Sequence, residues 1–162
     1  MLSLLSLILQ PDDSSIYAKR GELYIKLQEY YNALLDYTHI IRLDNNNTQA
    51  YFTRGCLCLD LQDYRAAIYD FTIVIGNSAT FIDAYKNRAI AHVAMEDYKS
   101  AIKDYTEIIN ICPNNVECLL NRANAYNALK NYDEAIADCT LAIGKRSEFS
   151  DAFYTRGCIK YS

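Results

Sequence analysis

The chain has 162 residues, of which 51% are hydrophobic and 22% charged, with a formal net charge of −4 and a pI near 5.1. This composition is typical of a soluble globular protein, and its acidic balance argues against a nucleic-acid partner, which needs a basic surface. The apolar segment at residues 1–9 is too short to span a bilayer and lacks the basic flank of a signal peptide, so we expect no membrane interaction.

A constant interval of 34 residues runs through the whole sequence. Arginine recurs at this interval five times: Arg20, Arg54, Arg88, Arg122 and Arg156. Four further columns keep it: Asp36, Asp70, Asp104 and Asp138; Tyr30, Tyr64, Tyr98 and Tyr132; Ala33, Ala67, Ala101 and Ala135; Thr38, Thr72, Thr106 and Thr140. A fixed period of this size marks a repeat architecture. Most repeated residues should therefore serve packing, and function should be sought where the repeats differ.

In chain order, residues 1–13 are predicted to be the second helix of a partial repeat, because they align with the end of later units. Four full repeats follow without gaps: 14–47, 48–81, 82–115 and 116–149. Residues 150–162 are predicted to be the first helix of a further partial repeat. We therefore expect a single array that is itself a segment of a longer one.

Each repeat is predicted to form two helices. Apolar and small residues recur at helical spacing in the first half, as at Tyr17 and Gly21, and in the second half, as at Ala33 and Tyr37. The residue before each second half suits a helix N-cap: Glu29, Asp63, Asp97 and Asn131. The small residues of the two helices, such as Gly21 and Ala33, should face each other, because close helix packing needs small side chains.

Two repeats carry a glycine near the end of the second half, at Gly76 and Gly144. Glycine readily takes the left-handed conformation that closes a helix. The second helices of these two repeats are therefore predicted to end early.

The period, the tyrosine and glycine spacing of the first halves and the closing Pro113 resemble the tetratricopeptide repeat. The resemblance covers the whole chain and implies an all-α fold, an α-α superhelix or solenoid of stacked antiparallel helical hairpins. Two local departures are Cys58 and His92, which stand where Tyr24 and Tyr126 occur in other repeats. Three repeats lack the closing proline, which Asn45, Ala79 and Ser147 replace.

The resemblance also implies a concave groove, lined by the first helices, that binds an extended peptide or a partner helix. The residues expected to bind the partner lie in the variable columns of these helices: Glu22, Lys26, Phe52, Cys56, Asp60, Lys86, Ile90, Leu120, Asn124, Asn127 and Tyr154. Aromatic and aliphatic anchors would supply affinity, and the amides would bond the backbone of the peptide. Acidic residues outnumber basic ones around this groove, which favours a neutral or basic protein or peptide.

One subclass of the family holds the acidic tails of heat-shock chaperones with a clamp of Lys, Asn, Asn, Lys and Arg on three successive first helices. Asn87 and Asn121 could each serve as the middle Asn of such a clamp. Their companions do not match: Phe52 and Cys56 precede the first, and Ile90, Asp151 and Thr155 surround the second. We therefore expect that this chain is not a carboxylate clamp for chaperone tails.

The arginine column has two interpretations. An exposed ladder of guanidinium groups would bind phosphates or acidic tails, whereas an aspartate follows each of the first four arginines by 16 residues and could pair with it. The sequence favours pairing and predicts an aspartate partner for at least three of Arg54, Arg88, Arg122 and Arg156. It leaves open whether the pairs form within a repeat or between repeats.

Catalytic and metal-binding motifs are absent from the sequence. The six cysteines form no CxxC pair, and the two histidines, His39 and His92, belong to no HExxH motif. We therefore expect a non-enzymatic protein without cofactor or metal, whose reduced cysteines indicate a cytoplasmic location.

A self-assembly module is the alternative function. The leucine-rich residues 2–9 and the last first helix, with Phe153, Gly157 and Tyr161, are complementary halves of one repeat. Two molecules could complete this repeat head to tail, through a heterologous contact that need not close into a ring.

Overall fold

The computed structural model describes residues 13–160, which divide after residue 79 into two compact units. Within this range there are nine α-helices and no strand, so the predicted all-α class is confirmed. The predicted helix at residues 1–13 lies almost entirely outside the described residues. None of the described helices combines the length and the apolar content of a membrane span.

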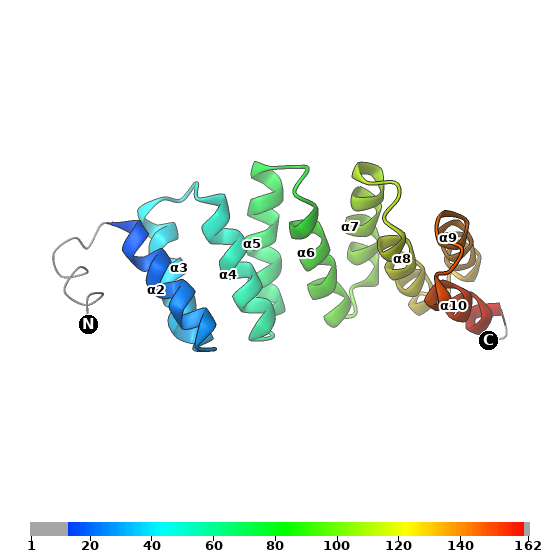
Figure 1. The fold of residues 1–162 in the computed structure, drawn as a ribbon, viewed down its shortest axis with the longest axis horizontal. Helices are drawn as coiled ribbons and strands as arrows, with labels where there is room; N and C mark the ends of the chain where they lie inside the picture. Colours follow the sequence, from blue (N-terminus) through cyan, green and yellow to red (C-terminus); the bar gives the residue numbers. More distant parts are fainter. Residues whose placement is uncertain (1–12, 161–162) are drawn as a thin grey trace. The chain divides into compact units, whose positions relative to one another are not determined.

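The N-terminal unit contains two antiparallel helical hairpins (Figure 1). The first pairs α2 (Ser14–Lys26) with α3 (Tyr30–Leu43), and the second pairs α4 (Thr48–Asp60) with α5 (Tyr64–Asn77). Helix α3 also packs on α4, so the two hairpins are stacked.

The C-terminal unit continues the same pattern with five helices among the described residues. Its hairpins are α6 (Ile82–Ala94) with α7 (Tyr98–Ile111), and α8 (Val116–Ala128) with α9 (Tyr132–Lys145). Helix α7 packs on α8, and α10 (Ser150–Lys160) packs on α9. Within each unit, every helix therefore contacts the helices before and after it.

The turn between the two helices of each hairpin contains a residue in the left-handed conformation. These residues are Gln28, Gln62, Glu96 and Lys130, with φ between 59° and 61°. The next residue is the N-cap of the second helix: the Asp63 and Asp97 side chains accept hydrogen bonds from the N–H groups of Ala66 and Ser100. The Glu29 and Asn131 side chains make no such capping bond. The sequence-based N-cap prediction is therefore confirmed by a side-chain bond at Asp63 and Asp97 only. The sequence did not predict the left-handed residues, because residues other than glycine, asparagine and aspartate seldom adopt this conformation.

Small residues allow the two helices of a hairpin to pack closely. Ala123 of α8 and Ala135 of α9 belong to one buried cluster, as predicted for these columns. A Cβ on Gly21 would lie 3.0 Å from the Tyr37 ring, and a Cβ on Gly55 would lie 2.8 Å from the Phe71 ring. The glycines thus make room for an aromatic ring of the second helix.

The prediction that Gly76 and Gly144 end their helices early is wrong. Helices α5 and α9 continue through these glycines and have 14 residues, as do α3 and α7. Neither glycine has positive φ. The cap N–H of Ser78 bonds the carbonyl of Val74, just as the cap N–H of Cys112 bonds that of Ile108. The hydrogen-bond register is therefore the same in all four repeats, and the conformational preference of glycine does not override it.

Candidate functional site

A pocket of about 260 Å³ opens between the first helices of the N-terminal unit. Its lining comes from α2, α3 and α4, and includes Ala18, Glu22, Tyr37 and Thr53. Tyr37 is buried at the floor. Burial raises the pKa of Tyr37, with a smaller contribution from Glu22, so the phenol is neutral. Glu22 is the predicted partner-binding residue that this pocket includes.

An equivalent pocket of about 170 Å³ lies in the C-terminal unit. Val93 of α6, Tyr98 and Tyr105 of α7, and Asn121, Asn124 and Ala125 of α8 line it. Tyr105 stands two repeats after Tyr37, and burial raises its pKa to about 12. In each unit, therefore, two successive first helices and a neutral tyrosine of the intervening second helix form a pocket. Both pockets also contain two amide side chains: Asn47 and Gln49 in the first, and Asn121 and Asn124 in the second.

The predicted partner-binding residues differ in exposure. Seven are exposed: Glu22, Lys26, Asp60, Lys86, Ile90, Asn124 and Tyr154. Four are half-buried: Phe52, Cys56, Leu120 and Asn127. The structure brings Asn124 together with Asn121, Tyr98 and Tyr105, which the sequence-based set did not include. The tyrosines belong to second helices, and only the pairing of helices in space places them beside a first-helix residue.

Two of the predicted anchors already make contacts inside the fold. The Phe52 ring lies 5.9 Å from the Phe71 ring, centroid to centroid, within the α4–α5 hairpin. Leu120 packs against two buried clusters of the C-terminal unit, including Leu119 and Ala123. Both side chains therefore contribute to packing, whereas Ile90 and Tyr154 are 44% and 76% exposed.

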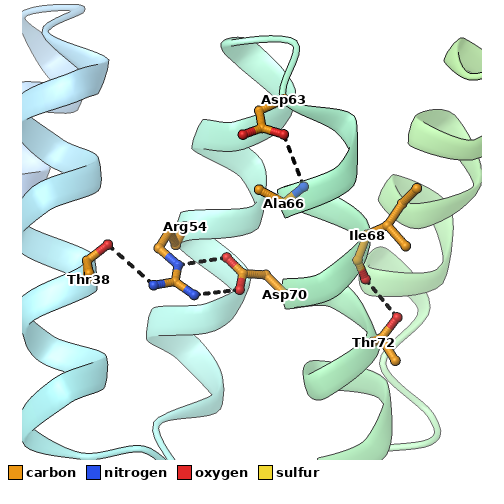
Figure 2. Close-up of polar contacts among 7 residues, drawn as sticks. All are labelled: Thr38, Arg54, Asp63, Ala66, Ile68, Asp70 and Thr72. Carbon is orange, nitrogen blue, oxygen red and sulfur yellow. Dashed lines mark hydrogen bonds and ion pairs between the residues drawn. The ribbon is translucent and has the colours of Figure 1, made fainter.

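The arginine column is paired with the aspartate column. Arg54 donates from Nε and Nη2 to the two carboxylate oxygens of Asp70, at 2.8 and 2.7 Å (Figure 2). The same two-bond pairing joins three further pairs: Arg20 with Asp36, Arg88 with Asp104, and Arg122 with Asp138. The predicted pairing is confirmed, and each pair forms within one hairpin. All four carboxylates are buried, so these guanidinium groups serve the fold rather than a ladder for anions.

Three arginines of this column also donate a hydrogen bond to a threonine of the preceding hairpin. The Arg54 Nη1 group donates to Thr38 Oγ1 at 3.3 Å, and Arg122 donates to Thr106 at 3.0 Å. Arg156 donates to Thr140 in the same way, at 3.3 Å. Thr106 uses its own hydroxyl proton in a bond to the carbonyl of the residue four positions earlier, which leaves its lone pairs for the guanidinium.

The cysteines and His92 show no reactive arrangement. None of the six cysteines forms a disulfide, and burial raises the pKa of Cys58 and Cys118 to about 11, which keeps these thiols protonated. Burial lowers the pKa of His92, although Asp104 and Asp97 oppose this shift. Among residues 13–160, no cluster of histidine, cysteine and carboxylate side chains could hold a metal ion.

Comparison with solved structures shows the same fold in other proteins. MamA (41-end) from Desulfovibrio magneticus RS-1 is 16% identical, with a TM-score of 0.82 over 91% of this chain and 84% of that one. YrrB, described as a TPR protein with an unusual peptide-binding site, is 19% identical, with a TM-score of 0.81 over 99% and 83%. The first TPR of Spaghetti (RPAP3), bound to the HSP90 peptide SRMEEVD, is 24% identical, with a TM-score of 0.66 over 72% and 93%. A search of curated proteins finds no match.

Family models agree with these structural likenesses. One model of the tetratricopeptide repeat matches residues 82–115 and 116–149, and a second matches residues 14–47. Together the matches cover more than half of the chain, and the solved neighbours share its stacked helical hairpins. The chain belongs to the tetratricopeptide repeat family.

Proposed function

We propose that this protein is a non-catalytic scaffold that binds an extended peptide or a partner helix on the first-helix faces of its hairpins. The pocket beside Asn124 carries the proposal. The amides of Asn121 and Asn124 can each donate to and accept from a peptide backbone. Val93 and the rings of Tyr98 and Tyr105 offer apolar area beside them. A few polar groups in a mostly apolar concavity are the usual make-up of a ligand site.

Relatives of the same fold support a peptide as the ligand. The YrrB structure is described by its peptide-binding site, and the Spaghetti domain holds a bound peptide. The other predicted residues extend the surface: Glu22, Lys26, Phe52, Cys56 and Asp60 in the N-terminal unit, and Lys86, Ile90, Leu120, Asn127 and Tyr154 in the C-terminal unit.

We further propose that the ligand is neutral or basic. In the first-helix columns expected to line or border the binding surface, Asp83, Glu117 and Asp151 are exposed against Lys86 in the C-terminal unit. Glu22 and Asp60 are likewise exposed against Lys26 in the N-terminal unit. An acidic tail would meet more carboxylates than ammonium groups in these columns, which is a further reason to propose that this protein is not a chaperone-tail clamp.

We also propose a cytoplasmic location. The six cysteines form no disulfide, and thiols in this number suit a reducing compartment.

A panel of random peptides displayed on phage, selected on the immobilised protein, tests the peptide proposal. The enriched peptides should bind wild type and lose about tenfold in affinity for Asn124→Ala, the scale of one or two lost hydrogen bonds. Asn110→Ala is the matched control, because Asn110 is an exposed asparagine on the second helix α7. Equal binding to both variants, or no enriched peptide, would contradict the proposal.

One observation favours self-assembly as a second candidate. A Cβ on Gly21 or Gly55 would contact a ring of the second helix, but a Cβ on Gly157 would meet no atom within 4 Å among the described residues. Phe153 and Tyr154 on the same helix are 45% and 76% exposed. The face of α10 that a second helix covers in other repeats is therefore open. In this second proposal, residues 2–9 of another copy cover it.

A further inference from the structure

A separate pocket of about 220 Å³ lies on the second-helix side of the N-terminal unit. Leu34 and Thr38 of α3 form one wall, and Ala66 and Tyr69 of α5 form the opposite wall. Arg54 and Cys58 of α4 line it as well, together with Asp63 and Asp70. Its lining shares no residue with the first-helix pockets, so it is distinct from the surface proposed for peptide binding.

Cys58 gives this pocket a small side chain where two other repeats have a tyrosine. Cys58 stands at the repeat position that holds Tyr24 in the first repeat and Tyr126 in the fourth. The Tyr24 ring lies 5.8 Å from the Arg20 guanidinium carbon, and the Tyr126 ring lies 5.9 Å from that of Arg122. The cysteine side chain is too short to make this contact with Arg54. The volume that a tyrosine ring fills in the first and fourth repeats is therefore left to the pocket here.

The pocket also offers a carboxylate to a polar hydrogen. In the third repeat, His92 stands at the Cys58 position, and its Nδ1 lies 3.5 Å from Asp97 Oδ2. Asp63 is the counterpart of Asp97 and lines the open pocket. Its Oδ1 accepts the Ala66 N–H in the first turn of α5 (Figure 2). Its second oxygen accepts no hydrogen bond from residues 13–160 and can accept one from a ligand.

The remaining lining favours an aromatic ring over a charged group. Leu34, Cys58 and Ala66 are apolar walls, and burial raises the pKa of the Cys58 thiol to about 11, so it carries no charge. Asp70 already neutralises Arg54, and its guanidinium carbon lies 5.5 Å from the Tyr51 ring. A second ring can still contact this guanidinium, as Arg20 contacts both Tyr17 and Tyr24. Tyr69 at the opening is 62% exposed, which leaves apolar area for a docked partner.

The side chains at the equivalent positions of the C-terminal unit differ from those of this pocket. There Tyr126 replaces Cys58, Glu134 replaces Ala66 and Ala137 replaces Tyr69. Tyr126 packs against the buried cluster of Ala123 and Ala135, so the chain supplies its own ring. This combination of lining side chains is therefore particular to the second repeat.

We propose that this pocket binds a tyrosine side chain of a partner protein, with the phenol ring against Arg54 and the hydroxyl donating to Asp63. The ring then takes the place that Tyr24 and Tyr126 take in their own repeats. Charge complementarity selects the group, because the ring face attracts the guanidinium and the phenol proton attracts the carboxylate.

The probe is p-cresol, which is the side chain of tyrosine. We expect saturable binding at roughly millimolar concentration, the scale for a ligand of this size, seen as shifts of the Ala66 and Tyr69 amide signals by NMR. Cys58→Tyr should fill the pocket, weaken binding at least tenfold and raise Tm. Cys112→Tyr, the same substitution at an exposed cysteine, should leave p-cresol binding unchanged. Equal binding to wild type and Cys58→Tyr would overturn the proposal.

Asp63→Asn tests the role of the carboxylate in a variant expected to fold, since Asn131 occupies this position in the fourth repeat. Wild type should bind p-cresol several-fold more tightly than toluene, and Asp63→Asn should reduce this preference. If wild type binds both compounds equally, the assigned hydrogen bond is wrong.

N-acetyl-tyrosine amide distinguishes a protein side chain from a small phenol. It should bind at least as tightly as p-cresol, and its exclusion from a pocket that binds p-cresol would overturn the partner-protein proposal. Asn124→Ala should leave all these affinities unchanged, because Asn124 lies outside this pocket. A failure of this site is thus distinguishable from a failure of the proposed peptide surface.

Discussion

Arg54 and Asp70 are joined by two parallel hydrogen bonds across the α4–α5 hairpin, at 2.8 and 2.7 Å (Figure 2). The same guanidinium reaches Thr38 of the preceding hairpin. One side chain therefore ties the two helices of its own repeat and links that repeat to its neighbour. In a solenoid, stability is a sum of repeat terms and interface terms, and Arg54 contributes to both.

Arg54→Leu should destabilise the N-terminal unit by about 3 kcal/mol, because it leaves the buried Asp70 carboxylate without a partner. The double variant Arg54→Leu/Asp70→Leu should recover much of this loss. Urea unfolding measures the free energies of unfolding, and hydrogen exchange should localise the loss to α4 and α5. A double variant no more stable than the single one would contradict this explanation.

Gly55→Ala and Gly157→Ala should have opposite effects on stability. The new Cβ at position 55 would lie 2.8 Å from the ring of Phe71, which is fully buried and cannot move aside. Overpacking of this kind costs about 1–3 kcal/mol. At position 157 the new Cβ meets no described atom, so the helix should gain up to about 1 kcal/mol from the better propensity of alanine. Thermal unfolding of the two variants makes the comparison, and a shift of the same sign in both would refute it.

Asn124→Ala should affect mainly peptide binding, whereas Leu120→Asp should also affect the stability of the fold. Asn124 is exposed, so its loss should weaken peptide binding and leave Tm nearly unchanged. Leu120 packs against two buried clusters, so an aspartate there should cost about 2 kcal/mol or more. Tm values and peptide affinities, measured on the same samples, provide the test. An unchanged Tm for Leu120→Asp would show that its contacts contribute little.

His92 should make stability depend on pH. Burial lowers the pKa of folded His92 below its unfolded value, so the unfolded chain binds the proton more tightly. The stability from neutral His92 is present above the unfolded pKa near 6.5 and is lost as the pH falls below it. His92→Tyr, which installs the residue of the first and fourth repeats, should reduce the fall in Tm between about pH 7.5 and 5.5. An equal fall in both proteins would exclude this role.

Gly157→Leu tests the proposed head-to-tail assembly. A leucine would block the close approach of a second helix to α10, just as rings contact Gly21 and Gly55 in their hairpins. Light scattering over a wide concentration range should show association of wild type and a monomeric Gly157→Leu variant. Deletion of residues 1–9 should have the same effect. A wild type that is monomeric at every concentration would remove this candidate function.

Some residues could not be assigned a role from the sequence because their partners are distant along the chain. The threonine column repeats as regularly as the arginines, yet its role as acceptor for the next repeat appears only when α3 and α4 are packed together. The left-handed residues Gln28, Gln62, Glu96 and Lys130 carry no glycine signal. From the sequence, Tyr98 and Tyr105 are expected to be core residues of a second helix. In the structure, α7 places them beside Asn124.

The 34-residue period by itself determined the all-α class, the helical hairpins and the pairing of arginine with aspartate, because each repeat makes the same local contacts at the same spacing. Only the tertiary structure decided that the pairs lie within a hairpin and that Leu120 belongs partly to the core. It also decided that the cysteine at position 58 leaves a pocket. Which atoms meet across stacked helices depends on side-chain size and direction in three dimensions, and a one-dimensional spacing does not contain that information.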